Sequence, residues 1–381
     1  MRVLVLIHEY PPVGGGGGTV AQDICRILAE KGHEIQLLTV RWEGVPAVEQ
    51  KDGILIHHLG RRRKQPYRAA FSEMALYTLC AFWKGLGIIR KWRPDLIHVH
   101  FALPGGLAAW ALSLVTGVPY VLTAHLGDVP GGVPEKTDRW FRWVYPVTPF
   151  IWRRASYRTA VSNYTRQLAL RHYPLPIEVV FNGVNLTELD PGEIRVQNPP
   201  RVLFVGRFVP QKNPLQVVRS LANLRHLPWQ CVMLGDGALR PEVEKLIGEL
   251  GLQERFILPG WVSPQEVQEW FRQSDILFIP SLSEGLPVVG VQAMAMGLAL
   301  VLSRVGGCVD LVEPQTNGFL LEKGDADGFE HALGMLLENQ EHLLSYRRAS
   351  RRLAARFDLK NVVESYQRIF TQVCKRSISE I

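Results

Sequence analysis

The 381-residue sequence has few cysteines, and it also lacks long hydrophobic runs. Its five cysteines are scattered with no C-x-x-C pair, which argues against a disulfide scaffold or a zinc site and suits a reducing compartment. The apolar run at the N-terminus covers only Val3 to Ile7, so a buried first strand explains it better than a signal peptide. No uncharged stretch approaches the roughly 20 residues that span a bilayer. These absences indicate a cytoplasmic protein without a membrane-spanning helix.

Several sequence signatures of common enzyme classes are also missing. The loop PPVGGGGGTV (11–20) would need a third glycine at Thr19 to match a dinucleotide-binding fingerprint, and LLTVRW offers no acid at the end of the second strand. No lysine follows the loop as in a P-loop, and no G-x-S-x-G elbow accompanies His125 to form a hydrolase triad. The glycines can still admit a phosphate to a helix N-terminus, with a flexible turn as the alternative interpretation.

Acidic charge is scarce in the first half of the chain. Residues 1–180 contain 22 Lys/Arg against 13 Asp/Glu, whereas the remainder is nearly balanced within the total of 43 against 36. A basic surface of this kind can meet nucleic acid, anionic lipid or a phosphorylated substrate. Composition alone leaves these partners open.

Short β-branched runs alternate with helical periods along the chain, which is typical of parallel sheets buried on both faces. The polar segment 185–200 interrupts the pattern and reads as a linker, after which the alternation restarts. We therefore predict an α/β fold of two facing Rossmann-like domains with a cleft between them, covering 1–185 and 200–357. The C-terminal helix, about 358–381, is expected to pack back onto the first domain. The predicted strands are 3–7, 34–40, 95–100, 119–125, 177–183, 201–207, 229–237, 255–260, 275–281 and 298–303.

Polar residues follow many of these strands, and ligands of open α/β sheets bind beyond the carboxyl ends of the strands. Arg207 and Lys212 suit a diphosphate beside the helix start at Asn213-Pro214, although exposed cations are usually only solvated. His98 and His100 end one strand, and His125 follows another. GDADG (324–328) is read as a helix cap rather than a metal site.

The stretch PSLSEGLPVVGVQAMAMG (280–297) places one acid before an apolar helix that begins near Pro287. The helix N-terminus could hold a diphosphate, with Glu284 outside it and Gln292 about two turns away. A capping Glu and a partly exposed Gln are the alternative interpretation.

Together these segments resemble the retaining GT-B glycosyltransferases of family 4, over nearly the whole chain. YPPVGGGGGT, EKGHEIQLLT, RPDLIHVHFALP, TAHLGD and VFNGVN are similar to motifs of the family's first domain. VGRFVPQKNP is similar to its G-R-x-x-x-x-K diphosphate clamp, and SLSEGLPVVGVQAMAMGLALV to its E-x7-E element. The resemblance implies a hexosyltransferase that needs no metal or cofactor and uses a nucleotide-sugar donor, with UDP- or GDP-sugars expected.

The resemblance also implies roles for matching residues. Catalysis would involve Glu284 on the sugar hydroxyls, Arg207 and Lys212 on the leaving diphosphate, and His125 beside the transferred sugar. Donor binding would involve Gly15, Gly16, Val262, Leu286, Pro287, Val288 and Gln292. At Gln292 the sequence departs from the family, because an amide stands where the second Glu of the element is expected to bind the ribose. We expect this exchange to weaken nucleotide binding rather than to change the reaction.

The acceptor is expected to be a lipid-linked sugar or another glycan, in glycolipid, polysaccharide or cell-envelope synthesis, and not a nucleic acid. Aromatic residues and cations are combined in 68–93 and 140–154, which predicts contact with an anionic membrane surface; core aromatics beside a solvated basic face are the alternative. A nucleotide-sugar epimerase of the same fold, a Rossmann oxidoreductase and a non-enzymatic lipid-binding module remain as other hypotheses.

Overall fold

The computed structural model describes residues 1–63, 69–132 and 144–379, and the chain divides into two compact units. Unit 1 contains Met1–Gly183 and Leu359–Ile381, and unit 2 contains Val184–Asp358. Each unit has its own cluster of buried apolar side chains, as expected for separately packed layers around two sheets.

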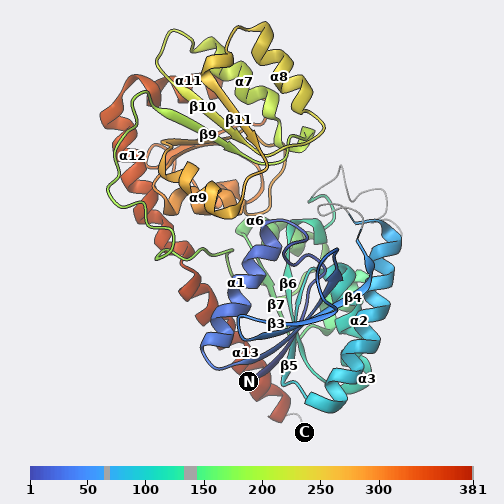
Figure 1. Cartoon of the computed structure of the whole chain (residues 1–381). Coiled ribbons are helices and arrows are strands. Elements are labelled where there is room, and N and C mark those ends of the chain that lie inside the picture. Colours follow the sequence, from blue (N-terminus) through green and yellow to red (C-terminus); the bar gives the residue numbers. More distant parts are fainter. Residues whose placement is uncertain (64–68, 133–143, 380–381) are drawn as a thin grey trace. The chain divides into compact units, whose positions relative to one another are not determined.

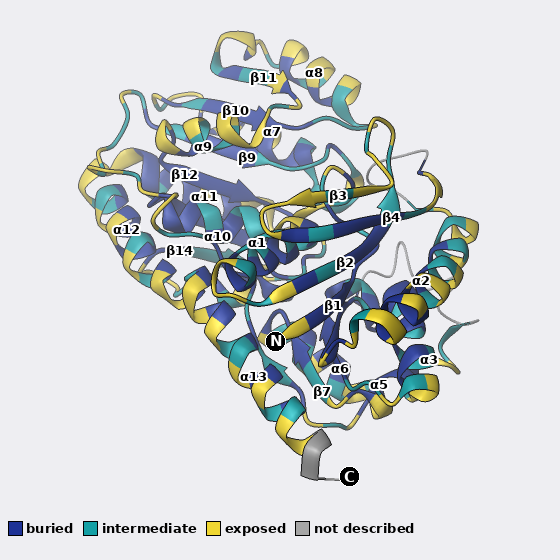
Figure 2. Cartoon of the chain, turned by 60° about the horizontal axis from the view of Figure 1, so that its bottom comes forward, coloured by how far each residue is buried: buried dark blue, intermediate teal, exposed yellow. Residues whose placement is uncertain are grey.

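Unit 1 is built on an eight-stranded sheet with the order β3-β4-β2-β1-β5-β6-β7-β8. All described neighbours run parallel except β3 and β4. The central strands are buried on both faces, which explains their unbroken apolar runs (Figure 2). The strands are β1 (Arg2–Leu6), β2 (Glu34–Arg41), β3 (Val48–Lys51), β4 (Ile54–Arg62), β5 (Leu96–His100), β6 (Tyr120–Ala124), β7 (Tyr157–Ala160) and β8 (Glu178–Val179).

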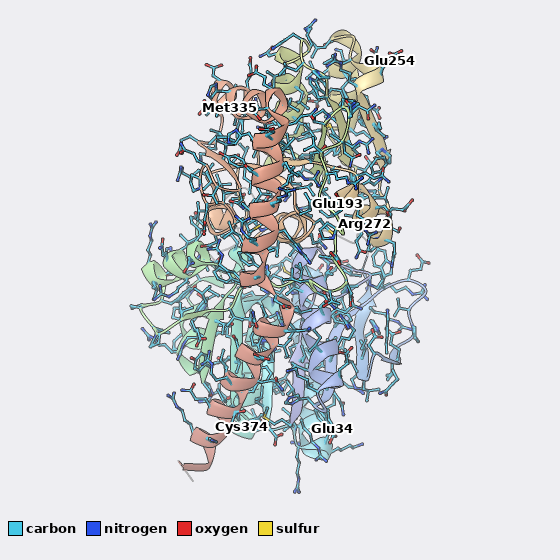
Figure 3. The ribbon with its side chains drawn as sticks, turned by 90° about the vertical axis from the view of Figure 1, so that its left-hand side faces the viewer. Glu34, Glu193, Glu254, Arg272, Met335 and Cys374 are labelled. Carbon is cyan, nitrogen blue, oxygen red and sulfur yellow. The ribbon has the colours of Figure 1, made fainter. Side chains whose placement is uncertain are left out.

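The helices of unit 1 cover both faces of this sheet (Figure 1). α1 packs against α13 on one face, and α2 packs against α3 on the other. Cys374, near the end of α13, lies at the same end of the unit as Glu34, the first residue of β2 (Figure 3). The helices are α1 (Gly16–Glu30), α2 (Phe71–Trp92), α3 (Leu107–Thr116), α5 (Thr148–Arg154), α6 (Asn163–His172) and α13 (Leu359–Ser379).

Unit 2 is built on a six-stranded parallel sheet with the order β11-β10-β9-β12-β13-β14. Its strands are β9 (Arg201–Val205), β10 (Gln230–Leu234), β11 (Phe256–Gly260), β12 (Ile276–Ile279), β13 (Ala299–Ser303) and β14 (Gly318–Leu321). α7 packs against both α8 and α11, and α10 packs against β13 and α12. The helices are α7 (Pro214–Asn223), α8 (Arg240–Glu249), α9 (Pro264–Arg272), α10 (Val288–Ala295), α11 (Ala326–Glu338) and α12 (Gln340–Leu353).

A buried ion pair fixes unit 2 at the amino ends of its strands. Asp275, just before β12, accepts from the guanidinium of Arg347 on α12, and both side chains are almost fully buried. Asp275 also accepts from the backbone nitrogens of Gln197 (3.1 Å) and Arg201 (2.7 Å). Three bonds around one carboxylate offset the cost of removing its charge from water.

Some elements differ from the sequence-based expectation. The first helix begins at Gly16, inside the loop 11–20 of the sequence analysis, so three glycines form its first turn. The strand expected over 177–183 contains only Glu178–Val179. Segment 185–200 has no helix or strand, as a linker would, but it is bonded to unit 2 through Gln197 and the carbonyl of Arg195. Strands β3, β4, β7 and β14 were not anticipated.

The cap predicted at GDADG is confirmed, because the Asp325 carboxylate accepts from the backbone nitrogen of Gly328 at 2.9 Å at the start of α11. The predicted helix start at Asn213-Pro214 is also confirmed, with Asn213 as the N-cap of α7. No helix in the described part of the chain is both long and apolar enough to cross a membrane.

Candidate active site

Each sheet contains one point where the order of its strands reverses. In unit 1 the chain proceeds from β1 to β2 on one side and from β5 to β6 on the other, so β1 and β5 flank the reversal. In unit 2 the reversal lies between β9 and β12. Ligands of open α/β sheets bind beyond the carboxyl ends of strands at such a switch point. The residues that follow these four strands are therefore the first candidates for a site.

In unit 2 an ion pair joins the two loops at the switch point. The Lys212 ammonium, in the loop after β9, donates to Glu284 Oε1 at 2.6 Å. Ser281 Oγ donates to the same oxygen at 2.7 Å, and no described residue donates to Oε2. Glu284 is 6 % exposed, while the Lys212 side chain is 15 % exposed. The structure thus brings together two residues that the sequence placed 72 positions apart.

Two further bonds hold the same loops in register. The backbone nitrogen of Leu282 donates to the carbonyl of Gln211 at 2.8 Å. The Gln211 side-chain amide donates to the carbonyl of Ser283 at 3.0 Å. Gln211 and Ser281 were not singled out from the sequence, because a polar residue in a loop carries no pattern that separates a tether from a solvated side chain.

Arg207 stands at the carboxyl end of β9 and is half-buried. Its guanidinium makes no hydrogen bond or ion pair with any residue in the described ranges. A guanidinium at a strand end with five unused donors can bind an anion such as a phosphate in a bidentate manner.

Glycines let neighbouring loops approach this edge closely. A Cβ on Gly306 would stand 1.6 Å from the carbonyl oxygen of Glu284, and one on Gly307 would stand 2.0 Å from that of Gly285. On the other side, a Cβ on Gly235 would stand 2.1 Å from the carbonyl oxygen of Gly206. Gly306 and Gly235 also have φ values of +53° and +124°, which L side chains rarely adopt. Gly206 and Gly235 directly follow β9 and β10, and that position was the available sequence signal for these two.

α10 begins directly after this loop, with Pro287 as its N-cap residue. The helix leaves the N–H groups of Val288 and Val289 at its N-terminal end, where the helix dipole favours an anion. Leu286 is buried under the loop, and Gln292 lies half-buried in the middle of the helix with no side-chain hydrogen bond to the rest of the described chain. Val262 follows β11, two strands away from the ion pair.

In unit 1 the glycine-rich loop lies against the strand ends. A Cβ on Gly18 would stand 2.3 Å from the carbonyl oxygen of Glu9, so only glycine fits there. A Cβ on Gly17 would stand 3.2 Å from the His125 ring. Gly15 is the N-cap of α1, and a Cβ there would meet nothing within 4 Å, which leaves open space at the helix start.

Aromatic and imidazole rings gather at the switch point of unit 1. The Phe101 ring is stacked on His125 with centroids 4.2 Å apart, and the His8 ring meets Phe101 edge-on at 4.9 Å. His100 Nδ1 and His125 Nε2 are 3.4 Å apart. Burial lowers the pKa of His125 to about 3 and that of His8 to about 4, so both rings are neutral at pH 7.

Asp128 fixes the backbone beside this cluster through hydrogen bonds. Its carboxylate accepts from the backbone nitrogens of His125 and Ala102, each at 2.8 Å, and from that of Leu103 at 3.4 Å. The bonds connect the loop after β6 to the loop after β5. Burial raises the pKa of Asp128 to about 7, against the effect of these three donors.

His98 lies inside β5 on the same face as His100, with ring centroids 4.4 Å apart. Its Nε2 is 2.9 Å from Thr123 Oγ1, and its ring packs against Tyr366 and Phe370 of α13. The expectation that it borders a ligand stays a prediction. Within residues 1–63, 69–132 and 144–379, no group of three His, Cys, Asp or Glu side chains is arranged to hold a metal ion.

Comparison with known proteins gives the same division of the chain. Residues 14–188 match the family described as Glycosyltransferase Family 4, and residues 187–353 match Glycosyl transferases group 1. A D-inositol 3-phosphate glycosyltransferase of Catenulispora acidiphila is 29% identical, with 92% of this chain and 88% of the relative covered.

Solved structures show the same fold. Sucrose-phosphate synthase of Thermosynechococcus elongatus matches with a TM-score of 0.85 at 21% identity, over 98% of this chain and 99% of that one. HepE of Anabaena, solved in complex with UDP-glucose, matches with a TM-score of 0.74 at 18% identity over 100% of both chains. The chain therefore belongs to the family 4 glycosyltransferases, and it is a glycosyltransferase with the GT-B fold.

Proposed function

We propose that this glycosyltransferase moves a sugar from a nucleotide diphosphate sugar, UDP- or GDP-linked, to a hydroxyl acceptor, with retention of configuration and without a metal ion. The observation that carries the proposal is the set of charges at the switch point of unit 2. Arg207 is unpaired within the described chain, and the Lys212–Glu284 pair is already formed at 2.6 Å. The UDP-glucose named in the complex of HepE supports a nucleotide-sugar donor.

These charges fit the chemistry of transfer. Breaking the sugar–phosphate bond builds negative charge on the diphosphate and positive character on the sugar. Arg207 and the N-terminus of α10 would stabilise the diphosphate, together with Lys212, whose ammonium has three N–H donors and spends one on Glu284. Glu284 would bind sugar hydroxyls through Oε2. Because Lys212 and Ser281 already hold this carboxylate, it would need no reorganisation when the donor binds.

Unit 1 would bind the acceptor and the transferred sugar. His125 is neutral, so it would offer a hydrogen bond or its backbone rather than a charge to the sugar. Gly15 and Gly16 would leave room for the donor phosphates, and Val262 and Gln292 would contact the nucleoside. We assign the product to glycolipid, polysaccharide or cell-envelope glycan synthesis.

A panel of UDP-, GDP- and ADP-sugars tests the donor assignment by thermal shift, followed by mass spectrometry of the products. We expect one nucleotide series to raise the melting temperature of the protein and to yield a glycosylated acceptor. Release of free nucleotide with an epimerised sugar and no acceptor would identify an epimerase instead. Retention is read from the anomeric configuration of the product by NMR.

Contact with the cytoplasmic face of a membrane is proposed for α2. Its outer face exposes Phe71, Leu79 and Trp83 beside the exposed cations Lys84, Arg90 and Lys91. Figure 2 shows exposed residues along this helix. Phe82 and Trp92 of the same helix are partly buried against the core, so only part of the aromatic segment is available. Of segment 140–154, residues 140–143 lie outside the described residues, Trp152 is buried and Phe150 is exposed.

Flotation with anionic and zwitterionic vesicles tests this contact. We expect Trp83→Ser to reduce binding to anionic vesicles several-fold, since interfacial aromatics and nearby cations act together. Leu114→Ser on α3, which is also an exposed apolar residue, is the matched control and should bind as the parent protein does. Equal flotation of the two variants would contradict the assignment to α2.

A further inference from the structure

A buried arginine that forms no ion pair with any described residue lies at the carboxyl edge of the unit 1 sheet. Arg63 directly follows β4 and is only 5 % exposed. Its backbone nitrogen donates to the carbonyl of Arg41 at 3.0 Å, which fixes the residue to the end of β2. Its one side-chain bond is long, from Nη1 to the carbonyl oxygen of His8 at 3.5 Å.

Two further donors of Arg63 are unused within the described residues. Nε and Nη2 are buried, and neither has a hydrogen-bond partner there. These two groups lie on the same edge of the planar guanidinium, which is the edge that binds a carboxylate or phosphate with two parallel bonds. Arg63 thus presents one complete pair of donors, the Nε–Nη2 fork, without a partner among the described residues.

Arg63 lines a small cavity. The cavity has a volume of about 30 Å³, and its polar lining includes His8, Glu73 and Tyr77 next to the apolar side chains of Val40 and Leu59. Within the described chain, Arg63 forms no ion pair with either nearby acid. Glu73 Oε2 accepts from the backbone nitrogen of Ala70 at 2.8 Å at the start of α2, and Glu9 lies 3.8 Å from His8 Nε2.

Such an arrangement is unfavourable unless something else binds there. An arginine cannot lose its proton at physiological pH, and an uncompensated buried charge strongly destabilises a protein. Burial lowers the pKa of Arg63, which reflects that cost, while Glu9 and Glu73 oppose it from a distance. An oxyanion on the Nε–Nη2 edge would satisfy both donors and neutralise the charge.

The cavity also belongs to the same edge as the ring cluster. His8, whose carbonyl accepts from Arg63, meets Phe101 at 4.9 Å, and Phe101 is stacked on His125 at 4.2 Å. His8, which lines the cavity, is thus connected through Phe101 to His125, the residue proposed to lie beside the sugar.

We propose that the Nε–Nη2 edge of Arg63 binds a carboxylate or phosphate group carried by the hydroxyl acceptor, so that the enzyme glycosylates an acid rather than a neutral alcohol. The proposal rests on the proposed function, which assigns acceptor binding to unit 1. Arg63 acts here as a binding residue that selects the acceptor by its charge.

Binding is tested with the smallest hydroxylated anions and their neutral counterparts. Glycerol 3-phosphate, glycerate and glycerol are titrated at constant ionic strength into the parent protein, Arg63→Met and Arg62→Met, with calorimetry and melting temperature as readouts. Arg62 is the matched control because it neighbours Arg63 but is exposed. We expect the two anions, but not glycerol, to bind to the parent and to Arg62→Met, and to bind at least tenfold more weakly to Arg63→Met. A preference for phosphate over glycerate identifies a phosphorylated acceptor, and the reverse a carboxylic acid.

The stability of the unliganded variants separates a ligand site from a structural role. Methionine fills similar space without charge, so Arg63→Met should melt no lower than the parent protein. Arg63→Lys keeps the charge but loses the fork, and we expect it to bind the anions more weakly than the parent and more tightly than Arg63→Met. Unchanged anion binding in Arg63→Lys would overturn the bidentate assignment even if Arg63→Met failed to fold.

Transfer assays connect the site to the acceptor. With the donor found in the nucleotide-sugar panel, a mixture of hydroxy acids, sugar phosphates and their uncharged analogues should give products from the acidic members only. For that acceptor, Arg63→Met should raise KM about 10- to 100-fold with little change in kcat. Equal transfer to neutral analogues would overturn this inference and leave the glycosyltransferase assignment standing. Anion binding through Arg63 without any response to a nucleotide sugar would instead contradict the proposed function and, with it, the acceptor role.

Discussion

The two switch points of this protein are built from opposite kinds of chemistry. At the edge of unit 1, the residues in contact are the neutral imidazoles His8, His100 and His125 and the ring of Phe101. At the edge of unit 2, they are the charged pair of Lys212 and Glu284, together with Arg207, which pairs with no described residue. Both sheets have a switch point of the same kind, but the side chains at the strand ends make one neutral and the other charged.

The difference agrees with the division of work in sugar transfer. A diphosphate gains charge as the bond breaks, so in the proposed function fixed cations at unit 2 would stabilise the transition state. The sugar and the acceptor hydroxyl are uncharged, and packed rings with neutral hydrogen-bonding groups suit them. Arg63 is the exception in unit 1, which is why its empty fork indicates an acid on the acceptor.

The largest effect is expected from the cations of unit 2. Arg207→Ala should lower kcat about 10²- to 10³-fold, as loss of one preorganised transition-state donor does. Its melting temperature should not change, because the Arg207 side chain bonds to nothing else in the described chain. Lys212→Ala should lose similar activity and also about 1–3 kcal/mol of unfolding free energy, because Glu284 would lose its charged partner while 6 % exposed. Steady-state kinetics and urea denaturation measure the two effects. Near-normal activity in both variants would show that the diphosphate binds elsewhere.

Low pH should reduce the folding stability of unit 1 more than that of unit 2. Burial lowers the pKa of His98 to about 3, of His125 to about 3 and of His8 to about 4, and that of His100 well below its usual value. As pH falls below about 6.5, the unfolded chain takes up protons that these folded histidines refuse, so folding stability is lost between about pH 6.5 and pH 3. At pH 5 each such histidine costs about 2 kcal/mol.

Asp128 acts in the opposite direction. Its pKa is raised to about 7, so the folded protein keeps a proton that the unfolded chain releases above about pH 4, and this contribution grows as pH falls from 7 to 4. The folding stability gained at Asp128 as pH falls offsets about the loss at one histidine. The folding stability of unit 1 therefore still decreases. Hydrogen exchange at pH 7 and pH 5 should show amides of unit 1 opening at lower free energy at pH 5, with unit 2 changed less. An equal response of the two units would contradict the contrast between neutral and charged sites.

Close packing behind Glu284 can be tested separately from its charge. Gly306→Ala would place a Cβ 1.6 Å from the carbonyl of Glu284 at a φ of +53°, so we expect a loss of about 2–4 kcal/mol in stability together with lower activity. Gly324→Ala is the matched control, because Gly324 has a φ of +84° but nothing within 4 Å of a built Cβ. It should cost only about 1 kcal/mol and leave kcat unchanged. Similar losses in the two variants would mean that backbone strain, not contact with the Glu284 loop, sets the cost.

Much of the fold was predictable because the central strands are buried on both faces and read as unbroken apolar runs. β3 and β14 were not predicted, since their exposed or half-buried residues show no such run. β4 ends in a block of arginines, which interrupts its apolar pattern. Only the tertiary structure shows that Arg61 and Arg62 are exposed while Arg63 is buried.

The candidate site was predictable in its charges but not in its tethers. Strand-end position and the family resemblance identified Arg207, Lys212 and Glu284. They did not show that Lys212 and Glu284 bind each other, because that contact depends on β9 and β12 being neighbours despite their separation in the sequence. The roles assigned to the donor-binding residues remain predictions.

The smallest effect is expected at Gln292, where this chain departs from its family. Its side chain lies half-buried on α10 and has no hydrogen bond within the described part of unit 2, so it is available to a ligand. A carboxylate there could accept from two ribose hydroxyls, whereas the amide accepts at one oxygen and donates at nitrogen. Because charge-assisted bonds are about twice as strong as neutral ones, Gln292→Glu should tighten binding of the nucleotide diphosphate about 3- to 10-fold. Calorimetry with the nucleotide alone measures this, and Gln292→Met, which removes both polar atoms, should weaken binding by a similar factor. If neither variant changes the affinity, the ribose does not lie along α10, and the charges of unit 2 would bind the diphosphate without help from the nucleoside.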